Sequence, residues 1–344
     1  MKITEQKINQ ATMALRRLCL FQDIAQDPVF DLAAQLAELL YQDSPIDVLE
    51  IYHDLVGQLA TSELEPAGTL TDPWQNHLLN LILYADNPFS RKAELCSLEE
   101  MGQSLIKAAR NDLEALQSIF NLGWILPEAV RFYLKQYSNI TLGDLPTWES
   151  FKGLDNGDSQ SISAIKKKFQ SGQNWQNLLP HLAAFYAANG TGDFARYLGF
   201  RWTGNSLKGI PNLDPIQLQD LIGYNKEREI ILENTEKFLQ GYPANNVLLY
   251  GDRGTGKSST VKALLHAYGS QGLRIIEVPK HSLGDYNQIT QIVAPRSQFF
   301  ILFVDDLSFD ENEGEYKDLK SILEGGLAAK PKNLLIYATS NRRH

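Results

Sequence analysis

One ten-residue stretch, Gly251 to Thr260, constrains the fold of this chain more than any other. It reads Gly-Asp-Arg-Gly-Thr-Gly-Lys-Ser-Ser-Thr and directly follows the apolar run Asn246 to Tyr250. An apolar run of this length predicts a buried strand. Beyond the loop, apolar residues recur at helical spacing at Val261, Leu264, Leu265 and Tyr268. The segment therefore predicts a strand, a glycine-rich turn and an amphipathic helix in immediate succession.

The loop fits the pattern G-x-x-x-x-G-K-[ST], in which Lys257 and Ser258 occupy the last two positions. Glycines allow backbone N–H groups to converge on an anion, and the start of the helix adds further free N–H groups. We therefore expect a phosphate-binding loop in which Lys257 reaches the terminal phosphates and the Ser258 hydroxyl ligates Mg²⁺. The expected nucleotide-binding residues of this loop are Gly251, Asp252, Arg253, Gly254, Thr255, Gly256, Lys257, Ser258 and Ser259. The alternative is a glycine turn with a solvated lysine.

A second apolar run, Phe299 to Val304, ends on the two carboxylates Asp305 and Asp306. In an open parallel sheet the carboxyl ends of the strands meet at one edge, so these acids can lie beside the glycine loop. We expect Asp305 to hold Mg²⁺ and Asp306 to orient or deprotonate an attacking water. The alternative is that the two acids only cap the loop that follows the strand.

A third apolar run, Leu334 to Ala338, leads through Thr339 and Ser340 to Asn341. An amide side chain at a strand end can hydrogen-bond both a terminal phosphate and the attacking water. We expect Asn341 to act in this way, and Thr339 or Ser340 could share the role. A plain strand-ending turn is the alternative. The expected catalytic residues are thus Lys257, Asp306 and Asn341, whereas the adjoining residues Arg342 and Arg343 are better read as a solvated or interface charge pair.

The segment Asp220-Leu-Ile-Gly223 precedes an amphipathic helical pattern upstream of the loop. Such a segment can fold over an adenine ring, and we expect Ile222 and Gly223 to pack on its face. The alternative is a helix with a purely structural role. Because no [NT]KxD motif for reading guanine follows the glycine loop, the sequence favours ATP over GTP.

The chain divides into two regions that differ in the spacing of their apolar residues. From the start to about residue 200, apolar residues recur at helical spacing, and Pro127 is expected just inside the start of one helix. Turn formers concentrate in residues 202–215, so we predict a helical domain over 1–203 and a second domain over 204–344. In the second domain, strands expected at 246–250, 273–278, 299–304 and 334–338 alternate with helical patterns. This alternation predicts an α/β fold with a parallel sheet and helices on both faces.

Composition limits the function. The net charge of −9 opposes nonspecific attraction to nucleic acid, and the longest apolar run of the C-terminal half has six residues, too few to span a membrane. The two cysteines, Cys19 and Cys96, form no CxxC pair, so we expect two buried thiols in a reducing compartment. The start of the chain lacks the pattern of a secretory signal. These features predict a cytoplasmic protein.

Five stretches carry a resemblance to a known family: GTGDFARYLGFRW (190–202), NNVLLYGDRGTGKSSTVKALL, FVDDLSF, YKDLKSILEG and IYATSNRRH. In this order they resemble the AAA+ superfamily of P-loop ATPases, and more closely the bacterial ATP-binding family called domain of unknown function 815. The resemblance covers residues 190–344 and extends only loosely over the first 180. It implies a P-loop NTPase fold, binding of ATP and Mg²⁺, ATP hydrolysis, and assembly into a ring or filament.

The sequence departs from the AAA+ pattern at two points. AAA+ enzymes usually carry glutamate where this chain has Asp306, and the shorter side chain implies slow hydrolysis. AAA+ modules also continue past this point with an arginine finger, a further strand and a helical lid that bears a second sensor arginine, whereas this chain stops at His344. We therefore expect the strand at 246–250 to be an exposed sheet edge, and this chain alone to bind ATP weakly and hydrolyse it poorly.

Two functions follow from these expectations. The first is an ATPase that couples ATP binding and hydrolysis to remodelling or loading of a macromolecular partner, with the helical domain as adaptor. The second is a nucleotide-gated binding module or switch in which hydrolysis is negligible, an option that Asp306 keeps open. A small-molecule kinase would need an acceptor pocket and an arginine-rich lid, and the sequence indicates neither.

Overall fold

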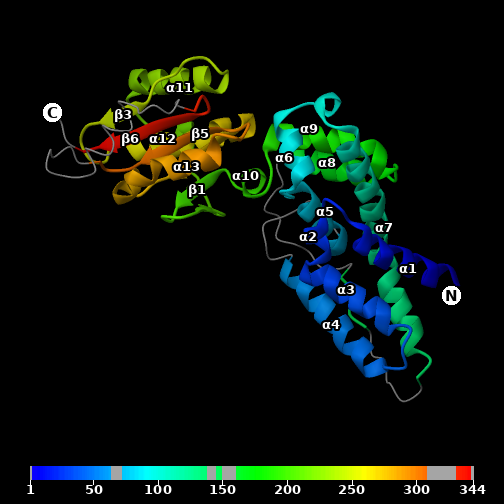
Figure 1. Ribbon diagram of the computed structural model, residues 1–344. Helices are drawn as coiled ribbons and strands as arrows, with labels where there is room; N and C mark the ends of the chain where they lie inside the picture. The colour runs from blue at the N-terminus through cyan, green and yellow to red at the C-terminus, as the bar shows by residue number, and fades with distance from the viewer. Residues whose placement is uncertain (1, 63–71, 138–144, 149–159, 308–330, 342–344) are drawn as a thin grey trace. The chain divides into compact units, whose positions relative to one another are not determined.

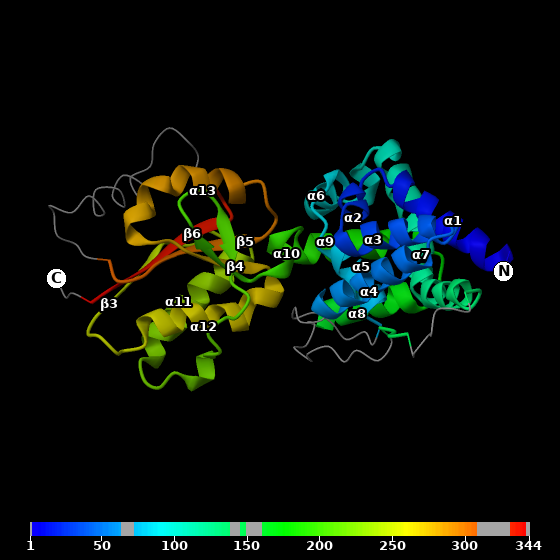
Figure 2. The same ribbon diagram turned by 90° about the horizontal axis from the view of Figure 1, so that it is seen from below.

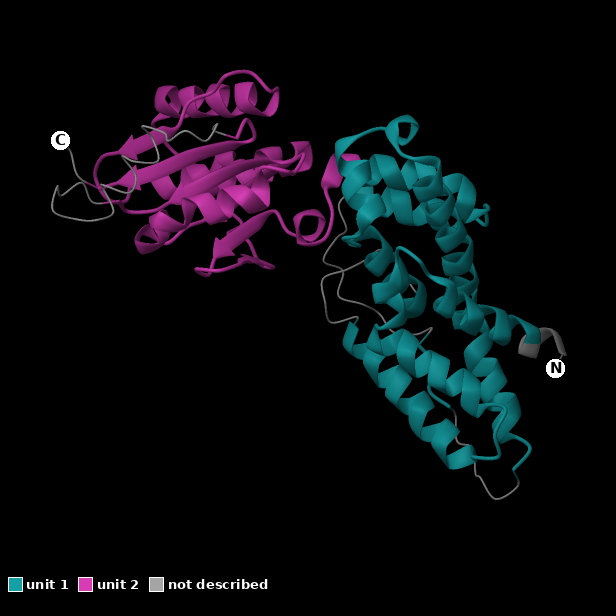
Figure 3. Cartoon of the chain, in the orientation of Figure 1, with its two compact units in different colours: residues 1–186 teal, residues 187–344 magenta. Residues whose placement is uncertain are grey.

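The computed structural model describes the chain except for residues 1, 63–71, 138–144, 149–159, 308–330 and 342–344 (Figure 1). The described residues form two compact units, 1–186 and 187–344 (Figure 3). The sequence pattern places the boundary at 203/204, whereas residues 187–203 lie in the second unit. The difference arises because residues 199–202 form a strand of the second unit's sheet.

Helices make up the regular secondary structure described in the first unit. They are α1 (Lys2–Arg17), α2 (Gln22–Ala25), α3 (Pro28–Leu39), α4 (Pro45–Ser62), α5 (Pro73–Leu83), α6 (Pro88–Leu95), α7 (Gln103–Leu134), α8 (Gln160–Gln170) and α9 (Leu179–Asn189), with 3₁₀ turns at Leu98–Glu100 and Trp175–Leu178. Helix α7 is the longest and contacts α1, α4, α5 and α6. The predicted helical N-terminal region is confirmed. None of the helices in the described ranges combines the length and apolar character that crossing a membrane requires.

The spacing of apolar residues correctly identifies the buried faces of this unit. The residues that recur at helical spacing in α1 and α4 are all buried, namely Ile8, Ala11, Leu15, Val48, Tyr52, Leu55 and Leu59. A buried carboxylate ties the chain after α1 to α7. Asp112 is 1% exposed and accepts hydrogen bonds from the backbone N–H groups of Cys19 (3.0 Å), Leu20 (2.7 Å) and Phe21 (3.1 Å). Because these donors have no helical partner, the carboxylate acts as their cap.

Two expectations for this unit are wrong. Pro127 lies inside α7 rather than at the start of a helix. A proline there removes one backbone N–H, which leaves the Gly123 carbonyl without its usual helical donor, but the residue is buried and packs within the core. The cysteines are free as expected but not buried: Cys19 is exposed and Cys96 is half-buried. Cys19 is exposed because it lies in the short link between α1 and α2.

The second unit is built on one mixed sheet. Its strands are β1 (Gly199–Trp202), β2 (Leu207–Gly209), β3 (Val247–Tyr250), β4 (Leu273–Glu277), β5 (Phe299–Val304) and β6 (Leu334–Ser340). They lie in the order β2-β1-β4-β5-β6-β3, and only the β1–β2 pair is antiparallel. All four strands predicted from the sequence are present within two residues of the expected bounds. The β1–β2 hairpin was not predicted.

Helices cover both faces of this sheet (Figure 2). They are α10 (Asp193–Arg196), α11 (Asn225–Leu239), α12 (Lys257–Tyr268) and α13 (Tyr286–Val293). One core joins α10 and α13 to one face of β5, while α11 and α12 pack on the other face. Successive residues of β5 alternate between the two cores, so that Leu302 belongs to one and Phe303 to the other. The predicted α/β fold with helices on both faces is thus confirmed, but the sheet is mixed rather than wholly parallel because β2 pairs antiparallel with β1. The helix expected between β5 and β6 lies outside the described residues.

Strand β3 is an edge of the sheet, as the sequence predicts. Among the described strands it pairs only with β6, through the register Val247 to Tyr337. The expectation that this strand is buried is wrong, because an edge position leaves its side chains open to solvent, with Leu248 43% and Tyr250 68% exposed. β3 leads directly into the glycine loop, so this edge lies next to the candidate site.

Candidate functional site

The loop between β3 and α12 turns through three glycines that have positive φ. These angles are 144° at Gly251, 80° at Gly254 and 81° at Gly256, the residue that caps the start of α12. A Cβ atom at Gly251 or Gly254 would meet nothing within 4 Å. The backbone conformation, and not a lack of space, is therefore what requires glycine here.

Helix α12 points its first turn into this loop. Its buried face is the one that the sequence predicts: Val261, Leu264, Leu265 and Tyr268. This packing anchors the helix against the sheet and leaves the amino end beside the carboxyl ends of β3, β5 and β6. The first backbone N–H groups of a helix have no helical partner and carry the positive end of its dipole. The loop and helix together form a place for an anion.

Lys257 folds back over the glycine loop. Its Nζ donates hydrogen bonds to the carbonyl oxygens of Gly251 (2.9 Å) and Asp252 (2.8 Å). Both acceptors are neutral, and ammonium groups bind charged oxygens more strongly than neutral ones. The lysine is therefore held in the loop by contacts that an incoming phosphate oxygen can replace.

Ser258 and Asp305 meet between α12 and the end of β5. The Ser258 hydroxyl donates to Oδ1 of Asp305 at 2.6 Å. Thr339, near the end of β6, donates to the same oxygen at 2.5 Å. The contact brings together the two side chains that the sequence assigns to a metal ion.

Asp306 has a left-handed backbone, with φ of 56°. Aspartate and asparagine adopt this conformation more readily than other residues with a side chain. Its N–H donates to Oγ1 of Thr339 at 2.9 Å, and its carboxylate accepts a hydrogen bond from the side-chain amide of Asn341. Asp306 and Asn341, predicted separately from two strand ends, therefore lie in direct contact.

Two hollows adjoin the loop. The first, of about 340 Å³, is lined by Arg253, Gly254, Thr255, Gly256, Lys257, Ser258, Ser259, Asp305, Asp306, Thr339 and Asn341. All of the predicted catalytic and metal-binding residues line it. The second, of about 530 Å³, lies between the loop, β3 and α11 and includes Gly251, Asp252, Leu221, Tyr224, Ile231 and Tyr250 among its lining residues.

The residues expected to contact a base are placed differently from the expectation. Ile222 is 95% exposed, and neither it nor Gly223 lines the second hollow, whereas the neighbours Leu221 and Tyr224 do. The guanidinium of Arg228 donates to the carbonyl oxygens of Leu221 (2.9 Å) and Gly223, which holds the segment against α11. Sequence reasoning missed these contacts. The available signal was an arginine in the first turn of a helix that follows a glycine.

A polar network fixes α11, which forms one wall of the second hollow, to the sheet. The Tyr337 hydroxyl of β6 lies 2.8 Å from Oγ1 of Thr235 and 3.0 Å from Nδ2 of Asn234. Asn234 also bonds the backbone of Asn245 through both ends of its amide, at 2.9 Å each. Burial raises the pKa of Tyr337, so its hydroxyl keeps its proton and remains a donor.

The donor set at Ser258 and Asp305 suits Mg²⁺ better than zinc. The described residues contain no group of three or more His, Cys, Asp or Glu side chains that could enclose a metal ion. Mg²⁺ in phosphate sites takes only one or two protein oxygens and completes its shell with phosphate and water. One carboxylate and one hydroxyl, 2.6 Å apart beside an anion site, fit that requirement.

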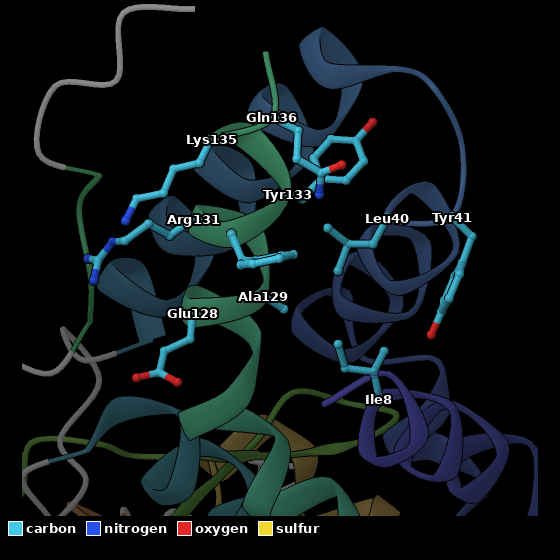
Figure 4. A pocket seen from close by; sticks show the side chains of 10 residues that line it. Ile8, Leu40, Tyr41, Glu128, Ala129, Arg131, Tyr133, Lys135 and Gln136 are labelled. Atoms are coloured by element: carbon cyan, nitrogen blue, oxygen red, sulfur yellow. The ribbon is translucent and has the colours of Figure 1, made fainter. Parts of the chain in front are cut away.

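A further hollow, of about 390 Å³, lies in the helical unit (Figure 4). Ile8 and Leu40 stand across it from Ala129, while Arg131 and Lys135 point away from these apolar side chains. Apolar side chains therefore face one another across the hollow, and the charged residues Glu128, Arg131 and Lys135 also contribute to its lining. None of the site residues predicted from the sequence lines this hollow.

Comparison with known proteins bears on the second unit. Residues 195–344 match the model of a family described as protein of unknown function (DUF815). This is the family that the motifs resemble, and the match extends through the glycine loop and the ends of β5 and β6. No curated protein matches the sequence.

Proposed function

We propose that the second unit is a P-loop ATP-binding domain of the AAA+ type. We further propose that it binds ATP with Mg²⁺ and hydrolyses it to remodel or load a macromolecular partner. The observation that carries this proposal is the 2.6 Å contact between Ser258 and Asp305 beside the glycine loop. This contact joins Ser258 of the proposed phosphate-binding loop to Asp305, the proposed metal-binding acid. A glycine turn with a purely structural role does not require such a contact.

The phosphates would occupy the first hollow. Backbone N–H groups of the loop and of the first turn of α12 would bind their oxygens, and Lys257 would exchange its two carbonyl acceptors for them. This arrangement needs no large movement because the lysine already lies over the loop. Its charge offsets part of the charge of the phosphate chain.

The base would occupy the second hollow. A volume of about 530 Å³ falls in the usual range for small-molecule sites, and its apolar side chains include Leu221, Tyr224 and Ile231. Apolar walls suit the faces of a purine ring. Leu221 and Tyr224 therefore take the role first expected of Ile222 and Gly223.

Mg²⁺ would be held by the Ser258 hydroxyl and the Asp305 carboxylate. The ion would offset the negative charge of the phosphates when bound. The Ser258 hydroxyl can donate its hydrogen to Asp305 while a lone pair on its oxygen remains free. The serine can thus serve as ligand without losing its contact with the acid.

Hydrolysis requires a group that orients water, and Asp306 is the best-placed carboxylate. It lines the first hollow together with Lys257 and Asn341. Asn341 would share its amide between the terminal phosphate and the water that Asp306 binds. Both side chains come from strand ends, which are rigid supports for such positioning.

A switch with negligible hydrolysis is the second candidate, and one observation favours it. The Asn341 amide bonds Oδ1 of the Asp306 carboxylate directly, which takes up one of the acceptor positions that could otherwise bind a water. In that case ATP occupancy alone would alter the binding of a partner. Turnover measured under saturating ATP separates the two candidates.

The remaining features of the proposal concern partners and compartment. We propose a homo-oligomer in which neighbouring subunits complete the site, and a helical unit that engages the macromolecular partner. Both cysteines are free, which suits a reducing compartment. We therefore place the protein in the cytoplasm, where ATP and Mg²⁺ are also supplied.

The test is equilibrium binding of radiolabelled ATP to the full chain, with and without Mg²⁺. Lys257→Ala should weaken binding at least tenfold because it removes the charge in the loop. The matched control is Lys262→Ala, a lysine of the same helix that pairs with Asp214 and lies outside both hollows. If Lys257→Ala binds ATP as tightly as Lys262→Ala does, the phosphate site is wrongly assigned.

A further inference from the structure

Thr339 makes three hydrogen bonds to the segment that carries the two acids. Its hydroxyl donates to Oδ1 of Asp305 at 2.5 Å and accepts from the N–H of Asp306 at 2.9 Å. Its backbone carbonyl accepts from the N–H of Leu307 at 2.8 Å. The residue is 2% exposed, so water does not compete for these contacts. One buried residue of β6 thus contacts three consecutive residues after β5, two of them through its side chain and one through its backbone.

These contacts give the two neighbouring acids different environments. Asp305 accepts two hydroxyl hydrogen bonds on Oδ1, from Ser258 and Thr339. Within the ranges that the structure describes, Oδ2 of Asp305 makes no hydrogen bond. Asp306 turns through a left-handed backbone and bonds Asn341 instead. The Thr339 hydroxyl is the only group described that bonds both acids.

We propose that Thr339 is a positioning residue for the metal-binding acid. Its hydroxyl fixes the rotation of the Asp305 carboxylate and the backbone turn at Asp306. Asp305 can then bind the metal ion, and Asp306 can orient the water. This inference rests on the proposed function, because a metal site gives the fixed rotation its purpose. A hydroxyl is needed for it, since only a group that both donates and accepts can bond a carboxylate and an N–H at once.

The two residues that follow Thr339 have different contacts. The Ser340 backbone carbonyl accepts from the N–H of Gly251 at 3.3 Å, which ties β6 to the start of the glycine loop. Asn341 reaches Asp306 only through its side chain. Thr339 therefore acts on the acids through its hydroxyl, whereas Ser340 supports the loop through its backbone. This distinction makes the hydroxyl of Thr339 separable by substitution.

The test compares Thr339→Val, which keeps the shape but removes the hydroxyl, with Thr339→Ser, which keeps the hydroxyl. Binding of a fluorescent ATP analogue is titrated with Mg²⁺ and repeated in EDTA. Loss of a group that orients a metal ligand typically weakens metal affinity ten- to hundredfold. Thr339→Val should therefore raise the half-saturating Mg²⁺ concentration about tenfold, with affinity in EDTA changed less than about twofold. Thr339→Ser should behave as the unchanged protein.

Residue-resolved hydrogen exchange of the nucleotide-free protein gives a second readout. In Thr339→Val the amide of Asp306 should exchange at least tenfold faster, because its acceptor is the missing hydroxyl. The amide of Leu307 should change less, because its acceptor is a backbone carbonyl. Thr290→Val, a half-buried threonine of α13, serves as the matched control and should alter neither measurement.

Three results would overturn the inference: unchanged Mg²⁺ dependence in Thr339→Val, an equal shift in Thr339→Ser, or unchanged exchange at Asp306. If Thr339→Val does not fold, Thr339→Ala removes the same hydroxyl and takes its place. If the unchanged protein shows no Mg²⁺-dependent nucleotide binding, the proposed function fails together with the role of Thr339 in metal binding. The exchange of Asp306 then tells separately whether the hydroxyl holds the turn.

Discussion

Ser258 Oγ lies 2.6 Å from Oδ1 of Asp305, although 47 residues separate them in the chain. The two reach one point because α12 begins, and β5 ends, at the same edge of the sheet. A hydroxyl and a carboxylate in this contact, next to a loop that turns through glycines, form the centre of the candidate site.

The Ser258–Asp305 pair should act as one unit. Ser258→Ala and Asp305→Asn should each weaken Mg²⁺-dependent ATP binding by about tenfold or more, because each removes an oxygen that serves the ion. The double variant should lose much less than the product of the two single losses, since both affect the same ion. Calorimetric titration of ATP in Mg²⁺ provides the three values. Ser270→Ala, remote from both hollows, is the control, and full additivity would contradict a shared ion.

Asp306 should be needed for turnover but not for binding. Asp306→Asn keeps a residue that tolerates the left-handed backbone, so folding and ATP affinity should be retained. Turnover should fall by a factor of about 10² or more, which is the usual contribution of a general base. Steady-state phosphate release at saturating ATP measures it. Equal turnover in the two proteins would exclude Asp306 as the base and favour the switch.

The left-handed backbone of Asp306 should also affect the stability of the second unit. Asp306→Ala should lower the free energy of unfolding of the second unit by about 1 kcal/mol relative to Asp306→Asn, because alanine is disfavoured at positive φ. Urea unfolding of the two variants, followed by a probe in the second unit, tests the difference. Equal stability would show that the turn is not strained.

Asp112 should stabilise the helical unit. Asp112→Ala leaves the backbone N–H groups of Cys19, Leu20 and Phe21 without their acceptor. We expect a loss of about 3 kcal/mol in the free energy of unfolding of this unit, since the bonds to a charged group are partly buried. Urea unfolding measured by helical circular dichroism is suited to the test. Asp31→Ala, an exposed carboxylate on α3, should change stability by less than about 0.5 kcal/mol.

Tyr337 should make stability depend on pH above 10. Burial raises its pKa above the ordinary value of 10.0, so the unfolded chain loses this proton before the folded one does. The stabilisation is complete below pH 10 and decreases as the pH rises through the folded pKa. Tyr337→Phe should therefore be less stable than the unchanged protein at pH 8, by about 1 kcal/mol for the lost hydrogen bonds. The difference should shrink at pH 11. A constant difference across this range would argue against the raised pKa.

The site could be predicted from the sequence because each of its parts follows an apolar run. Asp305 and Asn341 come directly after apolar strands, and Lys257 begins the helix that follows the glycine loop after β3. Parallel pairing brings the carboxyl ends of such strands together. The structure brings them to one hollow. The fold followed in the same way, since β5 is buried on both faces and its residues are uniformly apolar.

What the sequence did not reveal depends on tertiary contacts. Strand β1 has four residues and carries Arg201, whose charge is paired with Glu277 across the sheet, so its pattern is not that of a buried strand. Leu221 and Tyr224 line the second hollow because Arg228 holds the preceding segment, which no periodicity indicates. Pro127 lies inside α7 because buried residues on both sides of it, such as Leu126 and Val130, hold the helix in the core, and a local pattern of apolar spacing does not show where such a helix begins.

Strand β3 runs straight into the glycine loop, and in the described part of the chain it is hydrogen-bonded along only one side. A strand with a single neighbour has more freedom at its end than one held on both sides. A segment that pairs with the open side of β3 would restrict the motion of Tyr250 and of Gly251, the first glycine after it. The affinity for ATP proposed above would then depend on whether a segment is paired with the open side of β3, on the opposite side from β6.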